Sequence, residues 1–263
     1  MKRNIWALAL AAMMLLSACD YNEPILPEET SAPVQSTPPT ETTVETTPTE
    51  ATTEPSTQPS ISVPDALAAL LEECGASADT LAALGCTQLV TVVSEGASAQ
   101  IDLYLLEVDQ WCKQESFSCS GFVGKQGTQE EKTEGDMTTP KGLFPVGLGF
   151  YISEAPQTGL QTFQITTDTY WVDDPTSRYY NKRIEGTENK DWKSAEHMIS
   201  YGEAYAYGFV VDYNTDAIPY AGSAIFVHVG SRATAGCIAT QKASVLQYLS
   251  ALNESENPYI LIN

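Results

Sequence analysis

From Thr87 to the C-terminus, apolar residues come in short runs, and Gly, Pro, Asp or Asn separates one run from the next. Runs of this length are typical of β-strands, and the residues between them are typical of tight turns. Residues 88–94 and 99–108 flank Glu95-Gly96-Ala97-Ser98, which predicts a hairpin. Further strand candidates are residues 121–125, 144–148, 162–167, 207–213, 224–229 and 259–262. We therefore expect residues 87–263 to form a mainly β domain, a β-sandwich of mixed sheets with a few short helices.

Two segments have helical patterns instead. Residues 63–86 should form a short helical lead-in, because Pro64 suits a first helical turn and Gly75 and Gly85 suit helix ends. Residues 243–252 should form a helix after the last glycine-rich loop. Its apolar residues recur at helical spacing: Val245, Leu246, Leu249 and Leu252.

Residues 1–18 have the pattern of an export signal. A basic start is followed by an apolar run over residues 5–16, which is too short to span a bilayer comfortably. The sequence Leu16-Ser17-Ala18-Cys19 resembles a bacterial lipobox, in which Cys19 is lipidated and becomes the mature N-terminus. The alternative is an ordinary cleaved signal with an incidental cysteine. The lipobox predicts a protein exported and anchored to the outer face of the bacterial cytoplasmic membrane, facing the cell wall.

Residues 19–62 should not fold. From Asp20 to Ser62 the chain has 11 Thr, 8 Pro and 7 Glu, with no Lys or Arg. Such a segment buries too little apolar surface to offset the entropy of ordering it, and like charges keep it extended. We interpret it as a disordered tether between the membrane and the folded domain, although its Thr and Pro content would also suit a glycosylated stalk.

The net charge of the chain is −21. A charge of this sign argues against a nucleic-acid partner, because nucleic-acid binding needs a basic surface. We expect a monomer and no cofactor.

Export also bears on the six cysteines. With Cys19 assigned to lipid and Cys237 to chemistry, local spacing suggests disulfides between Cys74 and Cys86 and between Cys112 and Cys119. Four cysteines permit three connectivities, and free buried thiols are the alternative. No CxxC pair or spaced His cluster is present, so we expect no metal site.

The strongest candidate site is the segment that joins His228 to Cys237. The two residues are nine positions apart, and the chain has only two histidines. A thiol with its reference pKa of about 8.5 is mostly protonated at neutral pH, and a nearby imidazole can remove that proton. Gly236 lets the backbone turn closely, so that amides near Cys237 can donate to an oxyanion. Arg232 is either a ligand for a substrate carboxylate or an exposed loop residue.

This segment resembles the signature of the L,D-transpeptidase (YkuD) family. Thr234-Ala235-Gly236-Cys237-Ile238 fits its Gly-Cys half, and the stretch Glu134-Gly135-Asp136-Met137-Thr138-Thr139-Pro140-Lys141-Gly142 is similar to its GD-x-x-TP-x-G turn. Trp171 to Pro175, Tyr180-Asn181 and Ala195-Glu196-His197-Met198 look like a branch with a compact catalytic loop, so the resemblance covers residues 89–262. The spacing from His228 to Cys237 is shorter than usual, and Ala235 and Ala239 replace polar residues.

The resemblance implies an enzyme that crosslinks or trims peptidoglycan stem peptides through an acyl-enzyme on Cys237, with His228 as general base. It also implies a substrate-binding role for Arg232, Thr234, Tyr180, Asn181 and His197, although His197 also suits a structural role. An L,D-carboxypeptidase would use the same acyl-enzyme. A non-catalytic wall-binding lipoprotein that keeps the fold is the alternative from another class.

Overall fold

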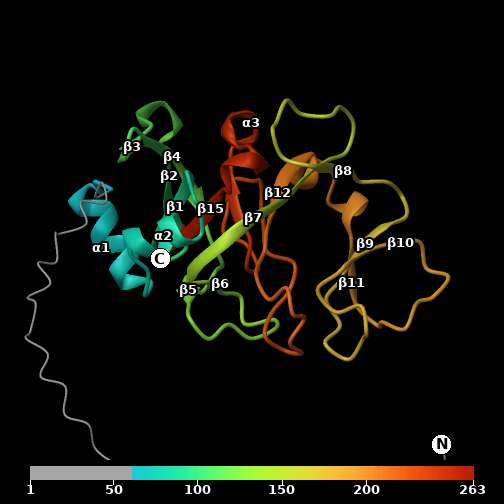
Figure 1. Ribbon diagram of the computed structural model, residues 1–263. Coiled ribbons are helices and arrows are strands. Elements are labelled where there is room, and N and C mark those ends of the chain that lie inside the picture. Colours follow the sequence, from blue (N-terminus) through green and yellow to red (C-terminus); the bar gives the residue numbers. More distant parts are fainter. Residues whose placement is uncertain (1–60) are drawn as a thin grey trace, which may run out of the picture. The chain divides into compact units, whose positions relative to one another are not determined.

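The computed structural model of the protein describes residues 61–263 (Figure 1). The predicted signal peptide, the lipidated Cys19 and all but the last two residues of the predicted tether lie outside the described residues. Within residues 61–263, no helix is both long enough and apolar enough to cross a bilayer.

The described part begins with two short helices, α1 (Asp65–Glu73) and α2 (Ala78–Ala83). Each ends just before a glycine with positive φ, Gly75 at 68° and Gly85 at 62°, as the sequence pattern predicts. Their apolar faces pack on the β-sheet in one cluster, whose buried members include Leu67, Leu71, Leu81, Leu89, Tyr104, Trp111 and Leu261. The helices are therefore attached to the sheet by a small core of their own.

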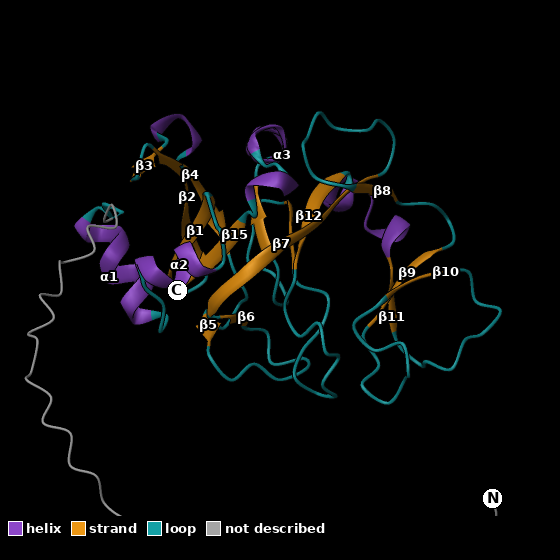
Figure 2. Cartoon of the chain, in the orientation of Figure 1, coloured by secondary structure: helices purple, strands orange, loops and turns teal. Residues whose placement is uncertain are grey.

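The main sheet has ten strands (Figure 2). Eight of them form a closed ring, because β1 pairs with β2 and so joins the two ends of the strand order. In ring order these strands are β1 (Gln88–Glu95), β15 (Tyr259–Ile262), β7 (Gly142–Tyr151), β12 (Tyr207–Val211), β13 (Phe226–Val229), β14 (Ile238–Thr240), β4 (Cys119–Phe122) and β2 (Ser98–Glu107). Two more, β3 (Gln110–Lys113) and β8 (Thr162–Gln164), extend β2 and β7.

The prediction of a mainly β fold with few short helices is confirmed, but the sandwich is wrong in detail. The sheet is mixed, since β1–β15 and β13–β14 are parallel pairs, yet it is one sheet closed on itself and not two facing sheets. Short strands with turn signals are common to sandwiches and barrels, so the pattern does not separate them. Closure depends on the long strand β2, which pairs with β1 on one edge and with both β4 and β3 on the other.

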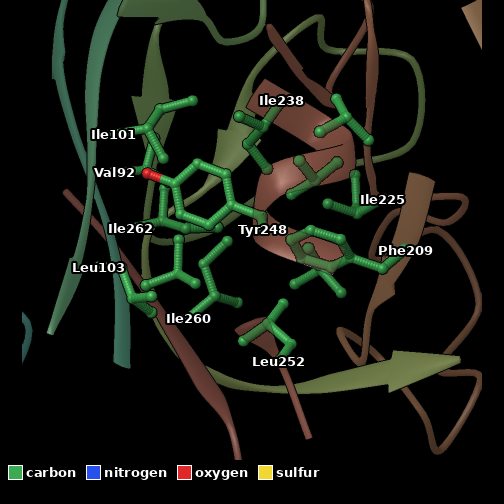
Figure 3. Close-up of a cluster of buried hydrophobic side chains, with 14 of the residues drawn as sticks. Val92, Ile101, Leu103, Phe209, Ile225, Ile238, Tyr248, Leu252, Ile260 and Ile262 are labelled. Carbon is green, nitrogen blue, oxygen red and sulfur yellow. The ribbon is translucent and has the colours of Figure 1, made fainter. Parts of the chain in front are cut away.

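The interior of the ring is the main hydrophobic core (Figure 3). Alternate residues of the strands point into it, in keeping with the two-residue period of a strand. Helix α3 (Lys242–Ala251), close to the predicted 243–252, adds Val245, Tyr248 and Leu249 to the same cluster. The strand residues drawn in Figure 3 include Val92, Ile101, Leu103, Phe209, Ile225, Ile238, Ile260 and Ile262.

Between β8 and β12 in the sequence, the chain forms a second sheet of three strands, in the order β10-β9-β11. Its strands are β9 (Thr169–Val172), β10 (Arg183–Glu185) and β11 (Ala195–His197), and a 3-10 segment, η2 (Met198–Tyr205), follows it. The sequence analysis missed these strands because each has only three or four residues. The remaining elements are η1 (Glu115–Phe117), η3 (Glu254–Glu256) and the pair β5 (Thr128–Gln129) and β6 (Thr139–Pro140).

Candidate active site

Cys237 comes directly before β14, and His228 lies on the neighbouring strand β13. His228 is on β13 and is paired in register with Ala239 on the parallel strand β14, two residues beyond Cys237. This register brings the backbones of the two residues close together. Val227 points into the barrel core, so its neighbour His228 points outward, and Cys237 packs in a second apolar cluster that includes Phe226. Both line one cavity of about 940 Å³.

The Cys237 side chain is buried, at 7% exposure, and its Sγ donates to the carbonyl of Ala224 at 3.2 Å. Ala224 has a positive φ of 54°, and its N–H donates to Oδ1 of Asn181 at 3.0 Å. Burial, and then the charge of Glu196, raise the pKa of the Cys237 thiol. At neutral pH the resting site therefore holds a thiol.

His228 is oriented by a backbone carbonyl. Its Nδ1 lies 2.9 Å from the oxygen of Val229. Because a carbonyl accepts and cannot donate, this contact favours the tautomer with the proton on Nδ1. Burial lowers the pKa of His228, and the hydrogen bonds to the carbonyls of Val229 and Ala204 oppose that shift in part. The imidazole is consequently neutral at pH 7 and available as a base.

Two threonines hold the Gly236-Cys237 turn. Thr139 Oγ1 donates to the carbonyl of Gly236 at 2.7 Å and accepts from the N–H of Gly124 at 2.8 Å. Thr234 Oγ1 donates to the carbonyl of Cys237 at 2.6 Å. A Cβ on Gly236 would lie 3.1 Å from the carbonyl oxygen of Thr138, so only glycine fits the turn without movement. The threonine of the predicted TP motif therefore shapes the loop that presents Cys237.

A buried ion pair lies behind this turn. Lys132 Nζ is 2.7 Å from Oδ1 of Asp136, and the N–H groups of Thr133 and Thr138 also donate to that carboxylate. Burial raises the pKa of Asp136, but these hydrogen bonds outweigh it and bring the pKa to about 2. The Lys132 ammonium lies 3.4 Å from the position of a Cβ on Gly236, and its charge opposes the rise in the Cys237 pKa.

Of the predicted substrate-binding residues, the structure brings Arg232 and Thr234 to the cavity. Tyr180, Asn181 and His197 are not among the residues that line it. Tyr180 donates its hydroxyl to Glu134 at 2.5 Å, and Asn181 supports the backbone of Ala224.

His197 uses both ring nitrogens, on the Thr167 carbonyl at 2.7 Å and on the Ser200 hydroxyl at 3.0 Å. Its ring stacks on Tyr170 with the centroids 4.6 Å apart. The partners of His197 are thus those of a structural residue.

The sequence analysis missed two residues of the cavity, Glu196 and Tyr205. The Tyr205 hydroxyl donates to Oε2 of Glu196 at 2.5 Å, and the Tyr205 ring meets His228 edge to face at 5.3 Å. Glu196 stands beside His197 in the sequence, and the alternation of β11 turns the two side chains to opposite faces.

The predicted disulfides are not formed: Cys74, Cys86, Cys112 and Cys119 are free thiols. Cys112 lies opposite Leu105 and Cys119 opposite Ile101 on the same edge of β2. Four residues along a strand are about 13 Å, well beyond the reach of a disulfide.

Cys74 and Cys86 donate to different carbonyls, those of Ile262 at 3.4 Å and Gln88 at 3.3 Å. Burial raises the pKa of Cys86 to about 12. Residues 61–263 hold no group of three or more His, Cys, Asp or Glu arranged to bind a metal ion.

No family model matches the sequence, and no curated protein matches it. Among solved structures, the fold is similar to the helical cell shape determining protein Pgp2 from Campylobacter jejuni, with a TM-score of 0.37 and 16% sequence identity. The match covers 67% of this chain and 47% of that chain, so this chain spans about half the length of that protein. The functional assignment depends on the residues of the site.

Proposed function

We propose that this protein is an L,D-transpeptidase-type cysteine acyltransferase that acts on peptidoglycan stem peptides. One observation carries the proposal: Cys237 and His228 line one cavity, with Nδ1 of His228 held by the carbonyl of Val229. Thr139, from the motif that carries the family resemblance, supports it by fixing the Gly236-Cys237 turn.

The resting pair is a neutral thiol and a neutral imidazole, so the reaction uses general-base catalysis and not a preformed ion pair. In the proposed acylation the thiol turns from the Ala224 carbonyl, Nε2 of His228 takes its proton, and Sγ attacks a carbonyl of the stem peptide. Amides at the Gly236-Cys237 turn stabilise the oxyanion. His228 then protonates the departing amine of the terminal D-amino acid and leaves a thioester on Cys237.

The cavity suits a peptide that carries a carboxylate. Its volume of about 940 Å³ is at the upper end of ordinary ligand pockets. Arg232 and Lys125 line it, and neither forms an ion pair with another residue in the described part of the chain. In the proposal the Arg232 guanidinium binds a substrate carboxylate, because its fork matches the two carboxylate oxygens.

The test is acylation by a carbapenem-type β-lactam, followed by mass spectrometry of the intact protein. We expect one adduct on the wild type and none on Cys237→Ala. Cys119→Ala, which removes a free thiol outside the cavity lining, is the matched control and should keep the adduct. An adduct that persists on Cys237→Ala would refute the assignment of the nucleophile.

Transpeptidase and L,D-carboxypeptidase share this acyl-enzyme and differ in whether an amine or water accepts the acyl group. Analysis of the products from defined stem peptides distinguishes them. For a non-catalytic wall-binding protein, the favouring observation is the raised pKa of the Cys237 thiol, which makes it a weak nucleophile without a base. An iodoacetamide-inert Cys237 would support that alternative.

The cellular location belongs to the proposal as well. We propose an exported protein with a lipid on Cys19, tethered by residues 20–62 to the outer face of the cytoplasmic membrane. Metabolic labelling with a palmitate analogue should mark the wild type and not Cys19→Ala. Equal labelling of both would remove the lipid anchor from the proposal.

A further inference from the structure

Glu196 is a carboxyl group in the candidate active site to which the proposed acylation assigns no role. It lies on β11 and lines the cavity that Cys237 and His228 also line. Its Oε2 accepts the Tyr205 hydroxyl at 2.5 Å. None of the ion pairs formed within residues 61–263 includes Glu196. A carboxyl group so placed is a ready partner for a cationic group that enters the cavity.

A second carboxyl of the same cavity, Glu203, provides the contrast. Glu203 is exposed, and Lys242 neutralises it with an Nζ–Oε1 distance of 3.1 Å. The cations Lys125 and Arg232 also line the cavity, without an acidic partner among the described residues. The cavity lining thus has two cationic side chains, Lys125 and Arg232, that can bind a carboxylate. It also has one carboxyl group without a cationic partner, Glu196, that can bind a cation.

Burial raises the pKa of Glu196 to about 7. The hydroxyls of Tyr205 and Tyr201 lower it, whereas the charges of Asp173 and Glu134 raise it further. The charge of Glu196 in turn raises the pKa of the Cys237 thiol. Near neutral pH, Glu196 therefore populates both its protonated and its ionised form, as a group that exchanges protons should.

We propose that Glu196 accepts the proton of a primary ammonium group that enters the cavity as the acyl acceptor. This inference rests on the proposed function, because it concerns the step after Cys237 is acylated. A primary amine of pKa about 8 to 10 arrives mostly as the ammonium ion, which has no lone pair for attack. Glu196 marks the amine subsite of the cavity, and its carboxylate converts the ammonium into a nucleophile.

The protons of this step balance. The ammonium gives one proton to the Glu196 carboxylate, and the amine then attacks the thioester carbonyl. The nitrogen loses a second proton to Nε2 of His228 as the C–S bond breaks, and His228 returns that proton to the Cys237 thiolate. The products are an amide, a thiol and a protonated Glu196, which releases its proton to solvent in the cavity.

The test measures how an acyl-enzyme divides between water and an amine. The full chain is acetylated with p-nitrophenyl acetate, glycinamide is added as acceptor, and the ratio of acetylglycinamide to acetate is measured from pH 5 to pH 10. Glu196→Gln should lower this ratio at neutral pH by about tenfold or more. Its initial p-nitrophenolate burst should remain. Above the pKa of the amine the variant should approach the wild type, because the free amine needs no base.

Glu203→Gln is the matched control and should divide the acyl group as the wild type does. The wild type alone gives a second measurement, which does not depend on the folding of a variant. Its ratio should rise through pH 7 with the ionisation of Glu196 and not only with the free amine. Equal ratios for wild type and Glu196→Gln at every pH would overturn the inference. Absence of acetyl on Cys237 of the wild type would instead overturn the proposed function.

Discussion

The two sides of the segment from β13 to β14 carry different polar groups, although both bury apolar side chains. On the inward face, Ile225, Val227 and Ile238 are 0 to 3% exposed, apolar and part of the barrel core. On the outward face, His228 and Cys237 line a cavity, and each is hydrogen-bonded to a backbone carbonyl. Neighbouring residues of this segment therefore face the barrel core and the cavity in turn.

This contrast shows how a rigid support and a reactive site can occupy the same short segment. A packed core has little freedom to shift, so it fixes the backbone from which His228 and Cys237 project. Substitutions of inward residues should change the free energy of unfolding, and substitutions of outward residues should change reactivity. The predictions below separate these two effects.

The largest effect is expected for His228→Ala on the outward face. Without a base near the thiol, the rate of acylation of Cys237 should fall by about 10² to 10⁴-fold. His197→Ala is the control, because His197 is the other histidine and is not among the cavity-lining residues. Carbapenem acylation rates of both variants, followed by mass spectrometry, check the prediction. Equal losses in the two variants would contradict the role given to His228.

The next effect belongs to the inward face. Ile238 is fully buried, and Ile238→Ala should destabilise the protein by about 2 to 5 kcal/mol through lost burial and a residual cavity. Ile238→Val removes one methylene and should cost about 0.5 to 1.5 kcal/mol. Urea unfolding measures both, and the acylation rate of the folded Val variant should match the wild type. If Ile238→Val kept the wild-type stability but was acylated more slowly, inward residues would also control reactivity, and the distinction between the two faces would be wrong.

Thr139→Val tests the link between the faces. The Thr139 hydroxyl is buried and joins the N–H of Gly124 to the carbonyl of Gly236. An apolar replacement of similar shape leaves both groups without this partner and should cost about 1 to 3 kcal/mol. Because the same hydroxyl shapes the Cys237 turn, acylation should slow as well. Thr139→Ser should recover both the stability and the acylation rate. If it recovered only the stability, the hydroxyl would not control acylation through the Gly236-Cys237 turn.

The sequence predicted most of this arrangement where local patterns decide it. Strand β15 has the predicted bounds of residues 259–262, and the hairpin of β1 and β2 turns where Gly96 predicts it. The turn residues around Gly236 were also predictable, because a glycine before a reactive cysteine has few structural alternatives.

Properties that depend on distant pairing were not predictable. Ring closure also requires pairings between strands far apart in the sequence, such as β1 with β15 and β4 with β14, which no local pattern encodes. The disulfides failed for the same reason, since sequence spacing says nothing about the separation of Cys112 and Cys119 along β2. Glu196 was missed because its burial and its contact with Tyr205 arise only when β11 and η2 pack beside the barrel.

The smallest expected effect is on the pH dependence of stability, and it concerns Asp136 behind the Gly236-Cys237 turn. Its folded pKa of about 2 is below the value of 3.8 for the free group. A depressed pKa gives stability that is present above pH 4 and is lost as the pH falls from about 4 to about 2. Urea midpoints between pH 5 and pH 2 should therefore fall more steeply for the wild type than for Asp136→Asn. If the urea midpoints of the two proteins fell in parallel, the ion pair of Asp136 with Lys132 would add nothing to stability. The effect of Lys132 on the pKa of Cys237 would then be its only role at this turn.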